Sequence, residues 1–380
     1  MLGIYLHIPY CRKICPYCDF NTYAVKAIPE EQYRDGIIRE VALLRERYDD
    51  LPTDISSIYW GGGTPSLLGS KSISKIHHAL DSSFSIPWNT IEVTAEANPQ
   101  DITANKAQEL SLVGINRVSL GSQSFNSKIL DVLGRDHSGA DIKTAVLYLQ
   151  EANVPNISLD LIFGIPGQAI ADLEKDIEEA VHLRPKHISA YSLTIEKGTP
   201  FFQSVSTGTM TPLPDEEVRS QYELLLQELP NRGFQQYEVS NFAQTGFQSI
   251  HNSNYWRRAS YLGLGAGAHS YLENRGFRWS NIGNPGEYIS RIGQNSLPVA
   301  WSEELGDDDE RSERIMLGLR TTHGIPISDL LELKEKREAL ILEGLAEISG
   351  SHFRLTQDGF CIADSIIEDL IASGTKTKET

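Results

Sequence analysis

The sequence is poor in cysteine, in basic residues and in long apolar runs. Only four cysteines occur among 380 residues, and three share one short loop, so a disulfide framework is disfavoured. The remaining one, Cys361, is expected to be a buried thiol. No run of about 18 apolar residues exists, which removes a membrane span. Lysine and arginine number 34 against 51 acidic residues, and the resulting net charge of -17 argues against a nucleic-acid partner.

The first residues lack the pattern that is typical of a targeting signal. Met1-Leu2-Gly3-Ile4-Tyr5 has no basic segment and enters an apolar strand at once, so we expect neither a secretory signal nor a transit peptide. Thiols that must stay reduced suit the cytoplasm, where we expect this protein. Hydrophobic residues make up 40% of the chain, enough for one large domain and a smaller one.

Three cysteines lie close together just after this strand. They form the pattern Cys11-x3-Cys15-x2-Cys18. Three thiolates on one tight loop are typical of a four-iron cluster in which one iron has no protein ligand and stays open to a small molecule. A structural zinc site is the alternative, but it needs a fourth nearby ligand. The sequence offers only His7 and Asp19, in no zinc-ribbon spacing.

Strand-like and helix-like segments alternate along the N-terminal half. Strands are predicted over 2–9, 55–61, 90–98, 117–125, 156–164 and 187–195, and helices over 30–47, 71–84, 103–113, 139–152 and 170–183. Strand-then-helix units in series without hairpin turns require parallel pairing through right-handed crossovers. This predicts an α/β fold, either a β/α barrel or an open part of one. A doubly wound sheet would also alternate, but the glycine-rich turn that opens its first helix is missing.

Polar side chains occupy one face of several strands. Glu92, Thr94, Glu96 and Asn98 alternate with apolar residues; Ser119, Gly121 and Gln123, then Ser158 and Asp160, repeat the pattern, and Tyr5 aligns with His7. A barrel interior filled only for stability would carry Val, Ile and Leu. We therefore expect a ligand inside the barrel. Solvated edge strands are the alternative, less favoured because helices should cover the outer face.

A known family shares these features. The cysteine pattern, together with Gly61-Gly62-Gly63-Thr64-Pro65 after the second strand, resembles the radical S-adenosylmethionine (SAM) superfamily, and Tyr5-Leu6-His7-Ile8-Pro9-Tyr10-Cys11 narrows the resemblance to the oxygen-independent coproporphyrinogen oxidases and their relatives. The resemblance implies a partial (β/α)6-type radical SAM barrel that holds a [4Fe-4S] cluster with SAM on its open iron. An electron donor then drives the cleavage of SAM to a radical, which the barrel shields from water.

The same resemblance assigns site residues. Cys11, Cys15 and Cys18 should ligate the cluster. The SAM-binding positions are Tyr5, Gly62 and Glu96 on the iron-bound molecule, Tyr17 against its adenine, and Gly63, Thr64, Gln123, Arg135 and Asp160, which in family members hold a second SAM. Without the family, each would be a polar residue satisfied inside a barrel, and Arg135 a solvated loop arginine.

Three features resemble the heme chaperones of this group, the HemW proteins, rather than the oxidases. The oxidase pattern continues to a fourth cysteine where this chain has Phe20, and the oxidases carry an N-terminal arm that we do not expect here. The segment His251-Asn252-Ser253-Asn254-Tyr255-Trp256 is similar to the His-Asn-x-x-Tyr-Trp signature of the chaperones. An imidazole can ligate heme iron and aromatic rings can pack on a porphyrin. His251, Tyr255 and Trp256 are therefore the expected heme-binding residues, with His269 a less favoured second ligand.

The resemblance thus implies heme as cargo and a heme-acceptor protein as partner. Two other interpretations remain: oxidation of a tetrapyrrole's propionate side chains to vinyl groups, and radical chemistry on an unrelated substrate. From the residues alone, His251 would be a packing or hydrogen-bonding histidine. Gly263, Gly265 and Gly267 indicate a strand whose backbone approaches something closely, such as the heme or the SAM region.

The C-terminal part has a different character. After an acidic stretch at 303–310, short amphipathic helices are predicted over 313–319, 327–333 and 337–342, a hairpin over 346–355, and a last helix over 362–372. This predicts a smaller α+β, winged-helix-like domain whose local charge is unfavourable for DNA. We divide the chain into a barrel core (1–235), an extension with the heme-binding segment (236–302), the C-terminal domain (303–372) and a disordered tail (373–380).

Overall fold

Six parallel strands form the centre of the fold. The computed structural model describes residues 2–375, and its central strands are β1 (Leu2–Ile8), β4 (Ile55–Gly62), β5 (Glu92–Ala97), β6 (Arg117–Gln123), β7 (Asn156–Phe163) and β8 (His187–Ser192). They lie side by side in chain order and pair in parallel. The predicted strands and their parallel pairing are thereby confirmed.

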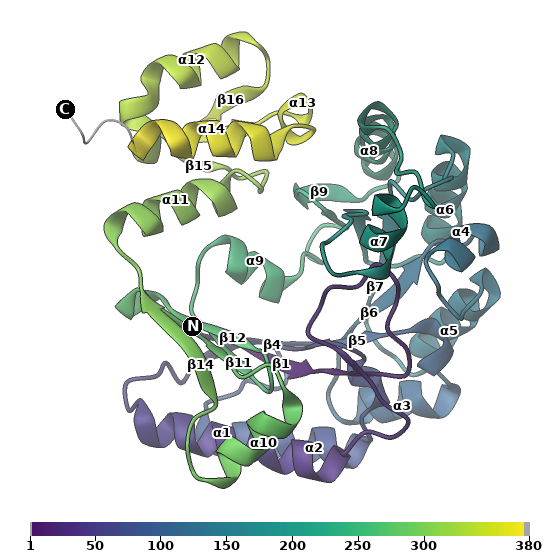
Figure 1. The fold of residues 1–380 in the computed structure, drawn as a ribbon, viewed down its shortest axis with the longest axis vertical. Coiled ribbons are helices and arrows are strands. Elements are labelled where there is room, and N and C mark those ends of the chain that lie inside the picture. Colours follow the sequence, from purple (N-terminus) through teal and green to yellow (C-terminus); the bar gives the residue numbers. More distant parts are fainter. Residues whose placement is uncertain (1, 376–380) are drawn as a thin grey trace.

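The predicted helices cover the outer face of these strands (Figure 1). They are α1 (Glu30–Arg47), α2 (Ser70–Ser83), α3 (Ala104–Leu112), α5 (Gly139–Glu151) and α6 (Ile170–His182). Local sequence explains where they begin: Thr103 accepts a hydrogen bond from the backbone of Lys106 at the start of α3, and Ser138 forms a capping box with Asp141 at the start of α5. Within residues 2–235, three further helices were not predicted, namely α4 (Ser127–Val132), α7 (Pro200–Ser206) and α8 (Asp215–Asn231).

Further strands extend the sheet beyond both edges of the parallel core. β10 (Asn241–Ala243) and β9 (Gln235–Glu238) follow β8, while β11 (Tyr261–Leu264), β12 (His269–Leu272), β13 (Phe277–Asn281) and β14 (Val299–Glu304) continue from β1. β11 is parallel to β1, and the other added strands are antiparallel to their neighbours. The result is one open, 12-stranded sheet.

Two helices connect these added strands. α9 (Ile250–Trp256) crosses the inner face of the sheet, where His251 contacts Ser57 of β4. α10 (Pro285–Gly293) packs against α1 on the outer face. Residues 236–302 therefore contribute to both ends of the sheet and to the wall of its interior.

The three glycines after Tyr261 do not form one strand, and this corrects the sequence prediction. Gly263 belongs to β11, whereas Gly265 and Gly267 lie in the turn to β12 with φ values of +100° and +77°. A Cβ at Gly265 would lie 2.5 Å from the carbonyl oxygen of His7, and one at Gly267 would lie 2.2 Å from the side chain of Asn21. The backbone at these two glycines does approach other atoms closely, as predicted. The atoms belong to β1 and to the cysteine loop of the protein itself, not to a ligand.

The C-terminal unit lies beyond α9 (Figure 1). It comprises α11 (Asp307–Gly318), β15 (Ile325–Pro326), η4 (Ile327–Leu333), α12 (Lys334–Leu342), β16 (Ala346–Ser349), β17 (His352–Leu355), α13 (Gln357–Phe360) and α14 (Ala363–Thr375). The predicted hairpin is confirmed as β16 and β17, and β15 adds a third strand.

The end of the chain differs from the prediction. α14 continues through Thr375, so the predicted disordered tail is wrong for residues 373–375, and 376–380 lie outside the described residues. Cys361 is half-buried rather than fully buried. Within the described range 2–375, no helix combines the length and apolarity that crossing a membrane requires.

Candidate functional site

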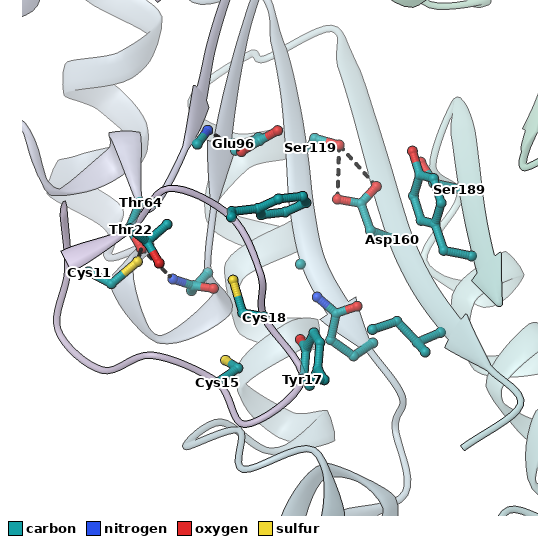
Figure 2. Close-up of a pocket in the computed structure, with 18 of the residues that line it drawn as sticks. Cys11, Cys15, Tyr17, Cys18, Thr22, Thr64, Glu96, Ser119, Asp160 and Ser189 are labelled. Carbon is teal, nitrogen blue, oxygen red and sulfur yellow. Dashed lines mark hydrogen bonds between the residues drawn. The ribbon is translucent and has the colours of Figure 1, made fainter. Parts of the chain in front are cut away.

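The three clustered cysteines lie on a loop whose base is closed by backbone pairing. β2 (Tyr10–Cys11) and β3 (Tyr23–Ala24) pair in parallel at this base, a feature that the sequence did not reveal. Figure 2 shows Cys11, Cys15 and Cys18 at one end of a pocket. All three are free thiols.

The surroundings of these thiols fit an iron–sulfur cluster. Thr64 Oγ1 donates a hydrogen bond to Cys11 Sγ at 3.5 Å, and Arg135 Nη1 donates one to Cys15 Sγ at 3.3 Å. Burial raises the pKa of the Cys11 and Cys18 thiols, so iron must displace their protons. Among residues 2–375, no three His, Cys, Asp or Glu side chains converge on a single metal ion. A four-iron cluster instead binds each thiolate at a separate iron.

The zinc alternative loses its nearest ligand in this arrangement. Nε2 of His7 donates to the carbonyl oxygen of Asn21 at 2.9 Å, so Nδ1 accepts from the Tyr5 hydroxyl at 3.1 Å. With both ring nitrogens engaged, His7 cannot complete a tetrahedral site with three thiolates. Asp19 is exposed and lines the pocket beside the cysteines.

The thiols close one end of a cavity of about 450 Å³ at the carboxyl ends of the parallel strands, where β/α barrels build their sites. We call it the cluster pocket. The predicted SAM-binding residues that line it are Tyr17, Gly62, Gly63, Thr64, Glu96, Gln123, Arg135 and Asp160. Tyr5 does not line it, and its contact with SAM stays a prediction. The ring of Tyr5 stacks on Tyr59, with centroids 6.1 Å apart, and lines a second cavity.

Glu96 is a half-buried carboxyl group at the end of β5. Its Oε1 accepts a hydrogen bond from the Tyr59 hydroxyl at 2.9 Å, and its Oε2 accepts one from the backbone N–H of Gly62 at 3.1 Å. Burial raises the pKa of Glu96 to about 7. Gly62 has a φ of +108°, and a Cβ there would lie 2.6 Å from the His7 ring, so glycine is required to present this N–H. Glu96 is thus placed to accept a hydrogen bond from an amino group in the pocket.

Asp160 and Arg135 are also half-buried and line the pocket. The Ser119 hydroxyl lies 2.9 Å from both carboxyl oxygens of Asp160 and donates one hydrogen bond that they share (Figure 2). Burial raises the pKa of Asp160. Arg135 is not a solvated arginine, since it also donates to the Gly121 carbonyl at 2.9 Å and to Asn98 Oδ1 at 3.1 Å. Within the described part of the chain its Nε has no partner, which leaves one donor unused.

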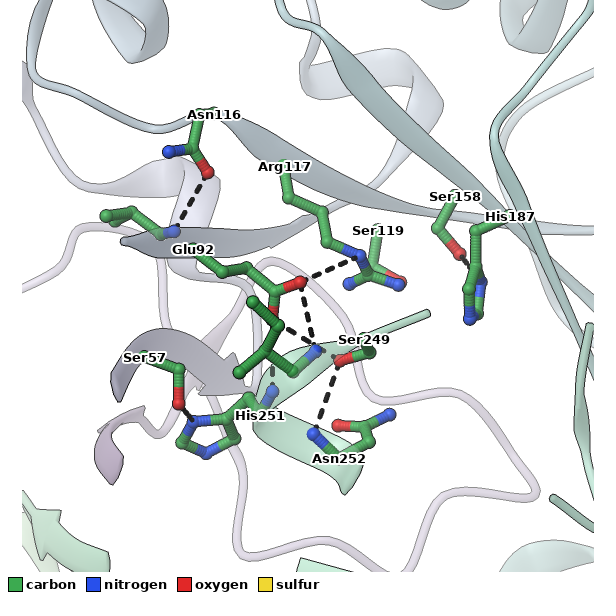
Figure 3. A network of polar contacts seen from close by, with 12 residues as sticks. Ser57, Glu92, Asn116, Arg117, Ser119, Ser158, His187, Ser249, His251 and Asn252 are labelled. Atoms are coloured by element: carbon green, nitrogen blue, oxygen red, sulfur yellow. Dashed lines mark hydrogen bonds and ion pairs between the residues drawn. The ribbon is translucent and has the colours of Figure 1, made fainter. Parts of the chain in front are cut away.

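A buried polar network beneath the pocket was not singled out from the sequence (Figure 3). Glu92 accepts hydrogen bonds from the backbone N–H groups of Ile250 and His251, both at 3.1 Å, and so caps the start of α9. Arg117 Nε lies 4.0 Å from this carboxylate. Among the described residues, Nε and Nη1 of Arg117 have no hydrogen-bond partner. Arg117 lies on the same face of β6 as Ser119, so strand alternation could have identified it.

His251 is enclosed between aromatic rings. Its Nδ1 is hydrogen-bonded to Ser57 Oγ at 2.8 Å and its Nε2 to the Tyr255 hydroxyl at 2.9 Å. Its ring centroid lies 5.1 Å from that of Tyr59 and 6.3 Å from that of Tyr5. We call Tyr5, Tyr59, His251 and Tyr255 the aromatic partition, because Tyr59 lines the cluster pocket while Tyr5 and Tyr255 line the second cavity.

This placement leaves His251 without a free ring nitrogen, and its role as heme ligand stays a prediction. His251 is only 1% exposed and both its ring nitrogens are engaged, so it offers no coordination position to an iron in this arrangement. Burial lowers its pKa to about 3, which keeps the ring neutral. Trp256 ends α9, is half-buried and lines neither cavity. Of the three predicted heme residues, Tyr255 alone borders one of the two cavities.

Comparison with known proteins places the chain in a family. Residues 5–180 match the Radical SAM superfamily, and residues 305–362 match the HemN C-terminal domain. A Bacillus subtilis protein named heme chaperone HemW is 36% identical, over 86% of this chain and 85% of its own length. A protein of the same name from Mycobacterium tuberculosis is 34% identical, over 97% and 94%. This chain belongs to the HemW family of radical SAM proteins.

A solved structure supports the fold of this HemW family member. Coproporphyrinogen III oxidase (HemN) from Escherichia coli matches it with a TM-score of 0.81 and 19% identity, over 97% of this chain and 89% of that one. The predicted radical SAM barrel with a smaller C-terminal domain is thereby confirmed. Membership of the superfamily implies a [4Fe-4S] cluster and SAM, and the cluster pocket has the thiols and buried polar groups that suit both. Phe20 follows the third cysteine and is 69% exposed at the pocket.

Proposed function

We propose that this protein is a heme chaperone, which binds heme and passes it to an acceptor protein. In this proposal Cys11, Cys15 and Cys18 hold a [4Fe-4S] cluster, and SAM binds exchangeably in the cluster pocket. The names of the curated relatives support heme as cargo. The observation that carries the proposal is the aromatic partition: the His-Asn-x-x-Tyr-Trp segment stands between the pocket for the cofactor and a second, tyrosine-lined cavity.

The residues of the cluster pocket have distinct roles toward the cofactor in this proposal. A [4Fe-4S] cluster held by the three thiolates would, when reduced, supply an electron to SAM. Glu96 accepts a hydrogen bond from the amino group of SAM, and Arg135 places a positive charge at the wall of the pocket beside the cofactor. Asp160, held by Ser119, accepts hydrogen bonds from hydroxyl groups.

Oxidation of coproporphyrinogen is the second candidate. The observation that favours it is the gathering of Gly63, Thr64, Gln123, Arg135 and Asp160, the positions of a second SAM in the oxidases, around one cavity. Phe20 argues against it, because the oxidase pattern has a cysteine at that position.

One experiment separates the two candidates. Anaerobically reconstituted protein is titrated with hemin while the Soret band is followed, and the same preparation is incubated with coproporphyrinogen III, SAM and a reductant. The proposal expects saturable one-to-one heme binding, transfer of that heme to a heme-depleted acceptor, and no loss of coproporphyrinogen. Non-saturable heme binding, or decarboxylation of coproporphyrinogen coupled to formation of 5′-deoxyadenosine, would overturn it.

A further inference from the structure

A second cavity lies between the sheet and the C-terminal unit. Its volume is about 490 Å³, within the range of roughly 300–1,000 Å³ common for small-molecule sites. One wall is the inner face of β1, β11 and β12, and the opposite wall includes Met316 and Leu317 of α11. The walls of the second cavity thus come from two parts of the chain that are far apart in sequence.

The lining suits a flat, conjugated ligand. Tyr5, Tyr255, Tyr261 and Tyr271 all border the cavity. The rings of Tyr255 and Tyr261 meet edge to face with centroids 4.6 Å apart, and the Tyr261 and Tyr271 centroids are 6.4 Å apart. Such rings present both apolar faces and polar edges to an aromatic macrocycle. Tyr255 comes from the His-Asn-x-x-Tyr-Trp segment, so that segment does border this cavity.

The histidines around the cavity differ in whether they can bind a metal. Both ring nitrogens of His7 are engaged, by Tyr5 and the Asn21 carbonyl, and both nitrogens of His251 are engaged as well. His269 lines the cavity from β12 and is exposed, and among residues 2–375 nothing hydrogen-bonds its ring. Burial of the ring and the nearby Arg278 cation lower the pKa of His269. Its imidazole is therefore neutral at neutral pH, which is the form that ligates iron.

We propose that heme binds in this second cavity and that a ring nitrogen of His269 ligates its iron. The inference rests on the proposed heme-chaperone function. It names a histidine whose ring has no hydrogen-bond partner among residues 2–375, whereas both ring nitrogens of His251 are engaged. In this assignment Tyr255 and Tyr261 contact the porphyrin, while His251 holds Tyr255 in place through their 2.9 Å hydrogen bond. One exposed ligand on an open strand face also suits a cargo that must leave, because an acceptor's own ligand can displace it.

Hemin titration of the full-length, cluster-reconstituted protein tests the assignment. The variants are His269→Ala, His251→Ala and, as a matched control, His78→Ala, whose histidine is exposed on α2. We expect His269→Ala to lose the imidazole-ligated heme spectrum and at least tenfold in affinity, and free imidazole to restore the spectrum because the cavity remains. His269→Cys should give a thiolate-ligated spectrum, a change that a merely structural role would not produce.

These outcomes distinguish failure of the His269 assignment from failure of the heme-chaperone proposal. If the unmodified protein does not bind heme saturably, both the chaperone proposal and the assignment of heme to the second cavity are overturned. If it binds heme but His269→Ala and His269→Cys keep its spectrum and affinity, the cavity assignment alone is overturned. Loss of the imidazole-ligated spectrum in His251→Ala but not in His269→Ala would overturn the assignment and identify His251 of α9 as the ligand.

Discussion

Replacing Glu92 by alanine should destabilise this protein far more than removing a surface carboxylate would. Glu92 is 8% exposed and caps α9 through two backbone N–H groups. Loss of such a cap costs about 0.5–2 kcal/mol. Arg117 is 1% exposed and would lose the carboxylate nearest to its guanidinium. Removing one partner of a buried ion pair costs about 3–5 kcal/mol. Since one carboxylate serves both contacts, the two costs overlap, and we expect about 3–5 kcal/mol in total.

Urea unfolding followed by far-ultraviolet circular dichroism measures this loss in the first unfolding transition. The matched control is Glu223→Ala, which breaks an exposed pair with Arg219 and should change the free energy of unfolding by at most about 1 kcal/mol. The double variant Glu92→Ala/Arg117→Met removes both charges and should recover part of the loss, because no buried cation is left without a partner. A loss below about 1 kcal/mol in Glu92→Ala, or a double variant as unstable as the two single variants added together, would refute this reasoning.

Three further predictions concern the cluster pocket. Alanine at any cysteine of the 11–18 loop should abolish the bound iron and sulfide measured after reconstitution, whereas Cys361→Ala should retain both. Gly62→Ala should cost about 1–3 kcal/mol more in urea unfolding than Gly114→Ala, because both glycines have positive φ but only the methyl group at 62 would meet a ring at 2.6 Å. Burial raises the pKa of Glu96 from 4.5 to about 7. Between these two pH values the folded carboxyl keeps a proton that the unfolded chain releases, so ionisation of Glu96 disfavours the folded state as the pH rises. Glu96→Gln should therefore stabilise the cofactor-free protein by at most about 3 kcal/mol at pH 8, and this gain should vanish towards pH 4.5. An equal gain at both pH values would contradict that explanation.

Local signals account for the parts of the fold that the sequence predicted. The bounds of α1, Glu30–Arg47, match the prediction because Pro29 and two glutamates mark its start and basic residues lie in its last turn. The central strands follow from their period-two alternation, which the shared lining of the cluster pocket confirms for β6. The cysteine loop is likewise a short, contiguous motif.

Long-range contacts account for what the sequence did not predict. β10 has three residues, too few for a periodic signal, and its place depends on pairing with β8. The burial of His251 depends on Ser57, which is 194 residues away along the chain. A motif can identify a histidine as unusual, but its free or occupied nitrogens follow from such partners. His269 lies on an ordinary four-residue strand, so no local motif distinguishes it in the sequence.

The aromatic partition gives the two cavities a common wall, so their ligands should influence each other. A ligand that moves Tyr59 in the cluster pocket also moves the ring of His251, which stacks on it at 5.1 Å and holds Tyr255 in the second cavity. We expect SAM to change heme affinity at least fivefold and heme to change SAM affinity by the same factor, since coupling between binding sites is reciprocal. Tyr255→Phe removes the hydrogen bond to His251 but keeps the ring, and should bring the factor close to one. Titrations of each ligand with and without the other measure this coupling factor. Equal affinities in the unmodified protein would show that the aromatic partition is rigid and does not couple the two cavities.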